Sequence, residues 1–320
     1  MRVLVAGGAG YIGSHVVWAL RDAGHQVTVA DNLSTGLRSN LPTDCELIET
    51  DLSDPGAAER LMKTNPEAAV LLAGAKAVGE SMQDPGKYAR NNLAAALYIV
   101  EALTRAGCYN LVFSSTAAVY GEPLYLPVDE EHPLDPQNFY GFTKCEVERL
   151  LGWYARLKGL RPGILRYFNA AGYDRAGRVT GQEVNPQNLI PRVLEVAAGR
   201  RSVIEVYGQD YPTRDGTGVR DYIHVSDLAR AHVLGLEKLA AGDKGFTINL
   251  GSEKGLSVFE IIETARRVTG RPIPVKVTDR RLGDPAEVLA SSKKAQQLLG
   301  WKAECSDPET LLSTAWAVYR

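Results

Sequence analysis

Cysteine is scarce in this sequence, with four residues in a chain of 320. They stand far apart, without the paired spacing that zinc sites and disulfide-rich domains show. The sequence therefore predicts no metal site and favours a reducing compartment, and we expect a cytoplasmic protein. The four positions are Cys45, Cys108, Cys145 and Cys305.

An excess of one charge is also missing, because the formal net charge is −2 and no basic run occurs. A balanced surface lacks the positive patch with which proteins bind nucleic acid or acidic membranes. Long hydrophobic runs are missing too, since no apolar stretch approaches the ~18 residues of a membrane-spanning helix. The opening apolar run meets Gly7 too soon for a signal peptide. We expect no nucleic-acid partner, no membrane insertion and no secretion.

The first part of the chain alternates short β-branched runs with longer amphipathic segments. This alternation is typical of a parallel sheet covered by helices, so we predict an α/β fold with a Rossmann-type doubly wound parallel sheet. The expected strands are residues 2–6, 26–30, 46–48, 69–72, 110–114 and 163–166. The expected helices are residues 12–23, 56–63, 87–106 and 141–158.

The pattern loosens after Asn169 into Gly-, Pro- and Asp-rich connections between shorter elements. We therefore predict two domains, a Rossmann domain over residues 1–169 and a smaller α/β domain over residues 170–320. A helical segment at 225–239 and a strand-like segment at 246–249 are apolar enough to pack back onto the first domain. The boundary is thus expected to be interleaved near residues 222–250.

A strand followed by Gly7, Gly10 and Gly13 and then by a helix is typical of a dinucleotide site. Such glycines allow a tight turn, close approach of the backbone to the pyrophosphate, and close packing of the helix on the sheet. Asp31 ends the second expected strand, 18 residues after Gly13. A carboxylate there binds the adenosine ribose and repels a 2′-phosphate, which favours NAD over NADP. The alternatives are an incidental glycine-rich turn and an ordinary turn aspartate.

A tyrosine and a lysine stand four residues apart at Tyr140 and Lys144, downstream of Thr116. On a helix these two residues share a face, so the lysine ammonium can favour the ionised phenol. An unperturbed phenol has a pKa of about 10, and the arrangement predicts a lower value that makes Tyr140 a base. The alternative is a solvated helix face.

These motifs resemble the extended short-chain dehydrogenase/reductase superfamily, and within it the whole chain resembles the UDP-glucose (UDP-galactose) 4-epimerase family. The glycine loop and the Tyr-x-x-x-Lys pair are typical of the superfamily, whereas the run around Lys76 and the run ending at Val225 are more specific to the epimerases. The segments that carry the resemblance are residues 5–15, 31–36, 73–81, 113–121, 165–172 and 215–225.

The resemblance implies reversible epimerisation at carbon 4 of a UDP-hexose with tightly bound NAD. Carbon 4 bears no acidic hydrogen, so the alcohol is first oxidised to a transient 4-keto sugar. By the resemblance, Tyr140 takes the C4 hydroxyl proton, Thr116 hydrogen-bonds that oxygen, and Lys144 binds the nicotinamide ribose. The family also implies a homodimer built on the helices near 87–106 and 141–158.

The resemblance assigns two further sets of residues. The NAD site is expected to comprise Gly7, Gly10, Tyr11, Ile12, Gly13, Asp31, Asn32, Ser34, Thr35, Gly36, Asp51, Leu52, Ala73, Gly74, Lys76, Asn91, Ser114, Tyr140, Lys144 and Phe168. The UDP-sugar site is expected to comprise Thr116, Tyr140, Asn169, Asn188, Leu189, Tyr207, Arg220, Arg281, Asp284 and Val288.

Two of these assignments leave alternatives open. Arg220 and Arg281 could be structural ion-pair formers with Asp221 and Asp284 instead of phosphate donors. Val288 occupies the position of a gate residue in the family, where a tyrosine restricts the pocket to glucose and galactose. A valine there predicts room for N-acetyl sugars, or else merely packs against the sheet.

Three other functions compete with this interpretation. A sugar-nucleotide 4,6-dehydratase needs an acid pair after the threonine, whereas Thr116 is followed by Ala117 and Ala118. A 4-epimerase of UDP-pentose or UDP-uronate is poorly separated by sequence motifs. A non-catalytic NAD-binding sensor on the same fold is also open, because fold does not fix function.

Overall fold

The computed structural model describes residues 1–183, 186–281 and 283–320. A sheet of seven parallel strands lies at its centre, in the order β10-β6-β5-β4-β1-β2-β3. The order reverses between β1 and β4, and ligands of such sheets bind at the carboxyl ends of the strands beside the reversal. The strands are β1 (Arg2–Ala6), β2 (Gln26–Asp31), β3 (Glu46–Glu49), β4 (Ala68–Leu71), β5 (Asn110–Thr116), β6 (Arg161–Tyr167) and β10 (Phe246–Leu250).

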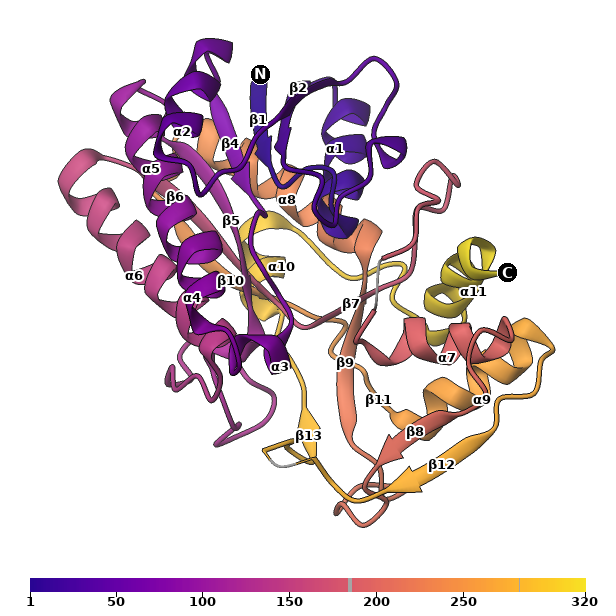
Figure 1. The fold of residues 1–320 in the computed structure, drawn as a ribbon. Helices are drawn as coiled ribbons and strands as arrows, with labels where there is room; N and C mark the ends of the chain where they lie inside the picture. The colour runs from indigo at the N-terminus through magenta and orange to yellow at the C-terminus, as the bar shows by residue number, and fades with distance from the viewer. Residues whose placement is uncertain (184–185, 282) are drawn as a thin grey trace.

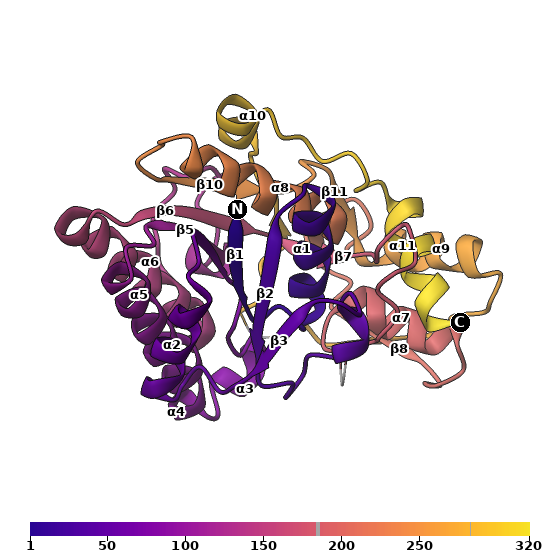
Figure 2. The same cartoon turned by 90° about the horizontal axis from the view of Figure 1, so that it is seen from above.

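Helices cover both faces of this sheet (Figures 1 and 2). One face carries α1 (Tyr11–Asp22) and α8 (Val225–Ala240), and the other carries α2 (Pro55–Leu61), α5 (Ala95–Arg105) and α6 (Phe139–Lys158). Each strand feeds both cores, because successive side chains point to opposite faces. On β1, Val3 and Val5 join the core under α1 and α8, whereas Leu4 and Ala6 join the core under α5 and α6. The predicted Rossmann-type fold is confirmed.

The predicted strands are present with small differences at their ends, and the segment predicted as a helix over 87–106 is helical but contains a π-helical turn that was not predicted. That segment divides into α4 (Pro85–Tyr88), the π-helix η3 (Ala89–Ala94) and α5. A π-helical turn rotates the side chains that follow it about the helix axis. Such turns often occur at functional sites. An amphipathic pattern does not reveal it. The other short helices are η1 (Arg38–Asn40), η2 (Met62–Thr64), α3 (Val78–Ser81) and η4 (Ala117–Val119).

The C-terminal part builds a second, smaller core around short strands (Figure 1). A four-stranded sheet contains β7 (Asn169–Ala171), β9 (Val219–His224), β11 (Gly255–Ser257) and β13 (Glu287–Val288). A two-stranded sheet pairs β8 (Ile204–Tyr207) with β12 (Val275–Thr278). The helices are α7 (Leu189–Ala197), α9 (Val258–Thr269) and α11 (Pro308–Tyr319).

Three segments from the second half pack on the first sheet. Strand β10 pairs with β6, α8 packs beside α1, and α10 (Lys293–Leu299) contacts both α8 and β10. Trp301 follows α10, is fully buried, and donates its indole N–H to the Asp227 carbonyl at 2.9 Å. The sequence did not suggest this return of residues 293–301. The division into two domains at residue 169 stays a prediction.

None of the helices in the described residues combines the length and the apolar character needed to cross a bilayer.

Candidate active site

The glycine loop after β1 is shaped by close backbone contacts. Gly7 has a φ of +83°, and a Cβ on it would lie 2.5 Å from the Ala73 nitrogen. A Cβ on Gly13 would lie 2.1 Å from the Gly7 carbonyl oxygen. The loop therefore tolerates only glycine at these two positions. Gly10 is the N-cap of α1 and has no side chain to cap it, so the first-turn amides can donate to a phosphate.

Asp31 at the end of β2 ties two loops together. One carboxylate oxygen accepts a hydrogen bond from the Ala9 amide at 2.9 Å, and the other accepts one from the Leu33 amide at 2.9 Å. These bonds fix the carboxylate beside the glycine loop while leaving lone pairs free for hydroxyl donors. Both interpretations of Asp31, loop anchor and ribose acceptor, thus fit one geometry. A dinucleotide fits this cradle of glycines, helix amides and carboxylate.

The remaining residues predicted for the NAD site lie at the carboxyl ends of β1 to β6. Tyr11 begins α1, and its hydroxyl donates to the Gly172 carbonyl at 2.5 Å. The Lys76 ammonium lies 5.8 Å from the centre of the Tyr11 ring and forms an ion pair with Glu183. The others are Ile12 in α1, Asn32, Ser34, Thr35 and Gly36 after β2, Asp51 and Leu52 after β3, Ala73 and Gly74 after β4, Asn91 in η3, and Phe168 after β6.

Asn92 is a residue of this region that the sequence analysis missed. Its side chain accepts from the Ala75 amide at 2.8 Å, donates to the Ala75 carbonyl at 3.1 Å, and donates to the Thr143 hydroxyl at 2.9 Å. It therefore clamps the loop after β4 to α6. A second asparagine beside Asn91 in an apolar helix was the available signal, and the π-helical turn is what aims the side chain.

The structure brings Thr116, Tyr140, Lys144 and Ser114 together where β5 ends against α6. Lys144 is 6% exposed, and its ammonium donates to the Ser114 carbonyl at 3.0 Å. The Thr116 side chain lies near the Tyr140 phenol and acts on its pKa. The Asn138 side chain caps α6 through the Gly141 amide at 2.8 Å, so the helix begins just before Tyr140.

The protonation properties of this cluster differ in part from the prediction. Burial raises the pKa of Tyr140, and the nearby Thr116 hydroxyl opposes the rise. Burial lowers the pKa of Lys144 to about 8, although the negative charge of Glu148 acts to raise it. The predicted lowering of the Tyr140 pKa by Lys144 is therefore not produced by the protein groups alone. The Lys144 ammonium donates to Ser114, and burial of the Tyr140 phenol is the largest effect on its pKa.

A second group of predicted residues gathers around β9. The Arg281 guanidinium stacks 3.7 Å from the centre of the Tyr207 ring, and Arg220 lies 4.0 Å from the Asp284 carboxylate. The side-chain amide of Asn169 donates to the Asp221 carbonyl at 3.1 Å and joins β7 to β9. Asn188 is exposed at the start of α7, where Leu189 is the first helical residue.

Val288 lies on β13, which pairs with β9 so that Val288 stands opposite Arg220. Its partly buried side chain packs against a small cluster that includes Val119, Tyr120 and Phe168. Val119 and Tyr120 follow Thr116 closely, so Val288 lies between the β9 residues and the end of β5.

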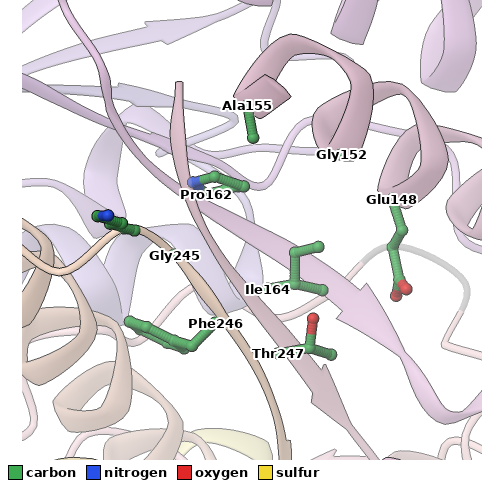
Figure 3. Close-up of a pocket in the computed structure, with 9 residues that line it drawn as sticks. Glu148, Gly152, Ala155, Pro162, Ile164, Gly245, Phe246 and Thr247 are labelled. Atoms are coloured by element: carbon green, nitrogen blue, oxygen red, sulfur yellow. The ribbon is translucent and has the colours of Figure 1, made fainter. Parts of the chain in front are cut away.

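A cavity of about 410 Å³ lies beneath α6 and is separate from this cluster (Figure 3). Its lining comes from α6, β6 and β10 and includes Glu148, Ile164 and Phe246. None of the predicted site residues lines it.

Comparison with known proteins gives one family. The profile of the NAD dependent epimerase/dehydratase family matches residues 3–251. The chain is 48% identical to a UDP-glucose 4-epimerase of Corynebacterium glutamicum, over 99% of this chain and 95% of that protein. A UDP-glucose 4-epimerase from Brucella ovis in complex with NAD superposes with a TM-score of 0.97 at 43% identity, covering 99% of this chain and 98% of that one. One from Bifidobacterium longum in complex with NAD⁺ and UDP gives 0.92 at 36% identity, with 99% and 98% covered.

Substitutions in the glycine loop separate packing from ligand contact. We expect Gly13→Ala to lower the thermal midpoint of unfolding, because its Cβ would meet the Gly7 carbonyl at 2.1 Å and overpacking costs about 1–3 kcal/mol. Gly10→Ala is the control, since its Cβ would have an ordinary contact of 3.5 Å. With NAD removed it should keep the wild-type midpoint, but it should bind NAD more weakly, because the pyrophosphate approaches there. Calorimetry of the NAD-free proteins and the NAD content of the purified proteins measure the two effects. A wild-type midpoint for Gly13→Ala would contradict the packing argument.

Proposed function

The chain belongs to the NAD dependent epimerase/dehydratase family, and from that membership we propose which of its residues carry the reaction. The reaction is epimerisation at carbon 4 of a UDP-hexose, with NAD as cofactor. One observation supports the assignment above all: Thr116, Tyr140 and Lys144 meet at the carboxyl end of β5. That edge of the sheet also carries the glycine loop.

In this proposal Tyr140 is the acid/base group. The C4 hydrogen of a hexose is not acidic, so inversion requires oxidation of the C4 alcohol and reduction from the other face. When bound, NAD supplies the hydride acceptor and donor, and the positive charge of its nicotinamide favours the ionised phenol. Tyr140 takes the C4 hydroxyl proton and later returns it. Thr116 holds the C4 oxygen in line with the phenol.

The other proposed roles follow the geometry of the two residue groups. Lys144, Asp31 and the amides at the start of α1 bind the riboses and pyrophosphate of NAD. Arg220 and Arg281 bind the diphosphate of the UDP-sugar through charge-assisted hydrogen bonds. Both guanidiniums are already oriented, one by Asp284 and one by the Tyr207 ring. The remaining predicted contacts, Asn169, Asn188 and Leu189, stay predictions.

Replacement of Tyr140 by phenylalanine tests the acid/base role. The change removes the hydroxyl and keeps the ring, so we expect kcat to fall by about 10²–10⁴-fold while NAD stays bound. The measurement is conversion of UDP-glucose to UDP-galactose by NMR. Tyr125→Phe is the matched control, because Tyr125 is exposed and bonds Asp129 away from the cluster. Wild-type turnover in Tyr140→Phe would refute the role.

The proposed substrate range includes the N-acetyl analogues of UDP-glucose and UDP-galactose. An acetamido group needs more room than a hydroxyl, and Val288 is much smaller than a tyrosine. The support is its position between the β9 residues and the cluster beyond Thr116. Val288 is thus proposed to keep the hexose pocket open.

We expect Val288→Tyr to lose the N-acetylhexosamine reaction selectively, by tenfold or more relative to the glucose/galactose reaction. The larger ring fills the space that an acetamido group would take. The measurement compares kcat/KM for both substrate pairs. Val277→Tyr is the control, because Val277 is exposed on β12. Unchanged selectivity in Val288→Tyr would refute the proposed role of Val288 as a gate.

The proposed assembly is a homodimer through α5 and α6, which pack side by side in the outer layer (Figure 1). Trp153 and Leu157 on α6 are 57% and 70% exposed and share a helix face, and Leu97 on α5 is exposed as well. Large apolar side chains gathered on neighbouring helices favour a self-complementary contact.

Light scattering tests this assembly. We expect the wild type to have the mass of two chains at micromolar concentration, and Trp153→Glu/Leu157→Glu to have the mass of one, because buried unpaired carboxylates are costly. Leu124→Glu is the control, since Leu124 is 75% exposed but stands on the loop between η4 and α6 and on neither helix. A wild-type monomer would contradict the proposal.

The competing functions receive less support. The relatives described above are UDP-glucose 4-epimerases over nearly their whole length, so neither a dehydratase, nor a UDP-pentose or UDP-uronate epimerase, nor a sensor is favoured. A cytoplasmic location stays a prediction from the sequence.

A further inference from the structure

A buried acid continues the catalytic face of α6 beyond Lys144. Tyr140, Lys144 and Glu148 are spaced four residues apart, so they lie along one side of the helix. Glu148 is 7% exposed. Burying a carboxylate costs several kcal/mol unless hydrogen bonds and an opposite charge compensate it. The roles proposed above do not explain why an acid lies there.

The Glu148 carboxylate is fully engaged inside the protein. Arg166 on β6 donates to it from Nε at 3.0 and 3.2 Å and from a terminal nitrogen at 2.6 Å. The Ser115 hydroxyl donates to its other side. Arg166 also donates to the Tyr120 hydroxyl at 3.0 Å, and that hydroxyl donates to Asn249 at 2.6 Å. The pair thus joins α6 to β5, β6 and β10.

The cavity beneath α6 does not make Glu148 a ligand-binding group. Figure 3 shows Glu148 reaching from α6 toward β6 and β10, with Gly152 and Ala155 one and two turns further along. Its side chain is only 6% exposed, and both oxygens already accept hydrogen bonds from Arg166 or Ser115. The carboxylate therefore makes its hydrogen bonds to groups inside the protein, and it is not available to a ligand in the cavity.

Glu148 and Lys144 hold neighbouring residues of the same strand. Lys144 donates to the carbonyl of Ser114, and Glu148 accepts from the side chain of Ser115. The next residue is Thr116, whose side chain lies near the Tyr140 phenol. Two successive turns of α6 are therefore fixed to the last residues of β5, and this fixes the register of Tyr140 against Thr116.

Glu148 also provides the negative charge for the Lys144 ammonium. Burial lowers the pKa of Lys144 to about 8, and Glu148 is the group whose charge raises it. Burial raises the pKa of both Tyr140 and Tyr167, so these phenols are neutral near pH 7 in the protein alone. The ammonium faces the Ser114 carbonyl and the Phe113 ring on β5, and it lies near Gly74, which Asn92 of η3 also approaches. Glu148 on α6 is the charged group that acts on it.

We propose that Glu148, held by Arg166, is a positioning residue that seats the Lys144 ammonium against β5 and balances its buried positive charge. This inference rests on the proposed function, because it acts through Lys144. It adds a requirement that the Tyr-x-x-x-Lys motif lacks: an acid one turn further along the helix, paired to the next strand.

The experiment compares Glu148→Gln with Glu146→Gln in the NAD-bound enzyme. Glu146 is on the same helix and pairs with Arg149 at 2.5 Å on the surface. Its replacement by glutamine therefore removes the same charge as Glu148→Gln does, but from a position that is not buried. The measurements are kcat against pH and the titration of Lys144 by NMR of protein labelled at the lysine ε-carbon, assigned with Lys144→Met. Lys144 acts as a cation, and loss of the neighbouring negative charge lowers its pKa. In Glu148→Gln we therefore expect the alkaline limb of activity and the NMR titration to move about one pH unit lower.

A Glu148→Gln enzyme with both curves at their wild-type positions would overturn the proposal, and so would an equal shift in Glu146→Gln. If Glu148→Gln does not fold because Arg166 is left uncompensated, Glu148→Gln/Arg166→Gln removes both charges. A smaller downward shift is expected there, because loss of the Arg166 positive charge offsets part of the change, and the absence of any downward shift again overturns the proposal. The NMR titration needs no turnover, so an inactive wild type would refute the proposed function separately.

Discussion

Helix α6 must lie in one register against the carboxyl end of β5, and the candidate site depends on that contact. Lys144 reaches the Ser114 carbonyl, Glu148 reaches the Ser115 hydroxyl, and Tyr140 meets Thr116. Each of the three interactions comes from a different turn of the helix. A shift of α6 by one residue would break all of them, because side chains one residue apart lie about 100° apart around the helix.

Burial sets the chemistry that this contact allows. Desolvation makes the phenol of Tyr140 a weaker acid and the ammonium of Lys144 a stronger one, so burial favours the neutral form of both groups. With a pKa of about 8, Lys144 still carries its charge near pH 7. Each needs a nearby charge to act as the mechanism requires. Glu148 provides a negative charge for the lysine. In the proposed mechanism the cationic nicotinamide would provide a positive one for the tyrosine, so that Tyr140 becomes a base in the cofactor complex.

Local patterns predicted much of this protein, and longer-range packing was out of their reach. Short β-branched apolar runs placed the strands of the first sheet, since each strand is buried between two cores. The glycine loop was readable because the spacing of its glycines is a local pattern, although the contact that requires Gly7 comes from the distant Ala73. The π-helical turn that aims Asn92, the return of Trp301 to the first sheet, and the pairing of Glu148 with Arg166 each depend on residues distant in sequence. A single sequence carries no sign of such pairings.

The central claim is that hydride leaves and returns to carbon 4 within one closed site, with Tyr140 moving the proton. Its most direct test follows UDP-glucose deuterated at carbon 4 in ordinary water, using purified protein and no added NAD. NMR of the UDP-galactose formed should show deuterium retained at carbon 4, because the hydride never exchanges with solvent. Loss of deuterium to solvent, or turnover only when NAD is supplied in excess, would contradict the account.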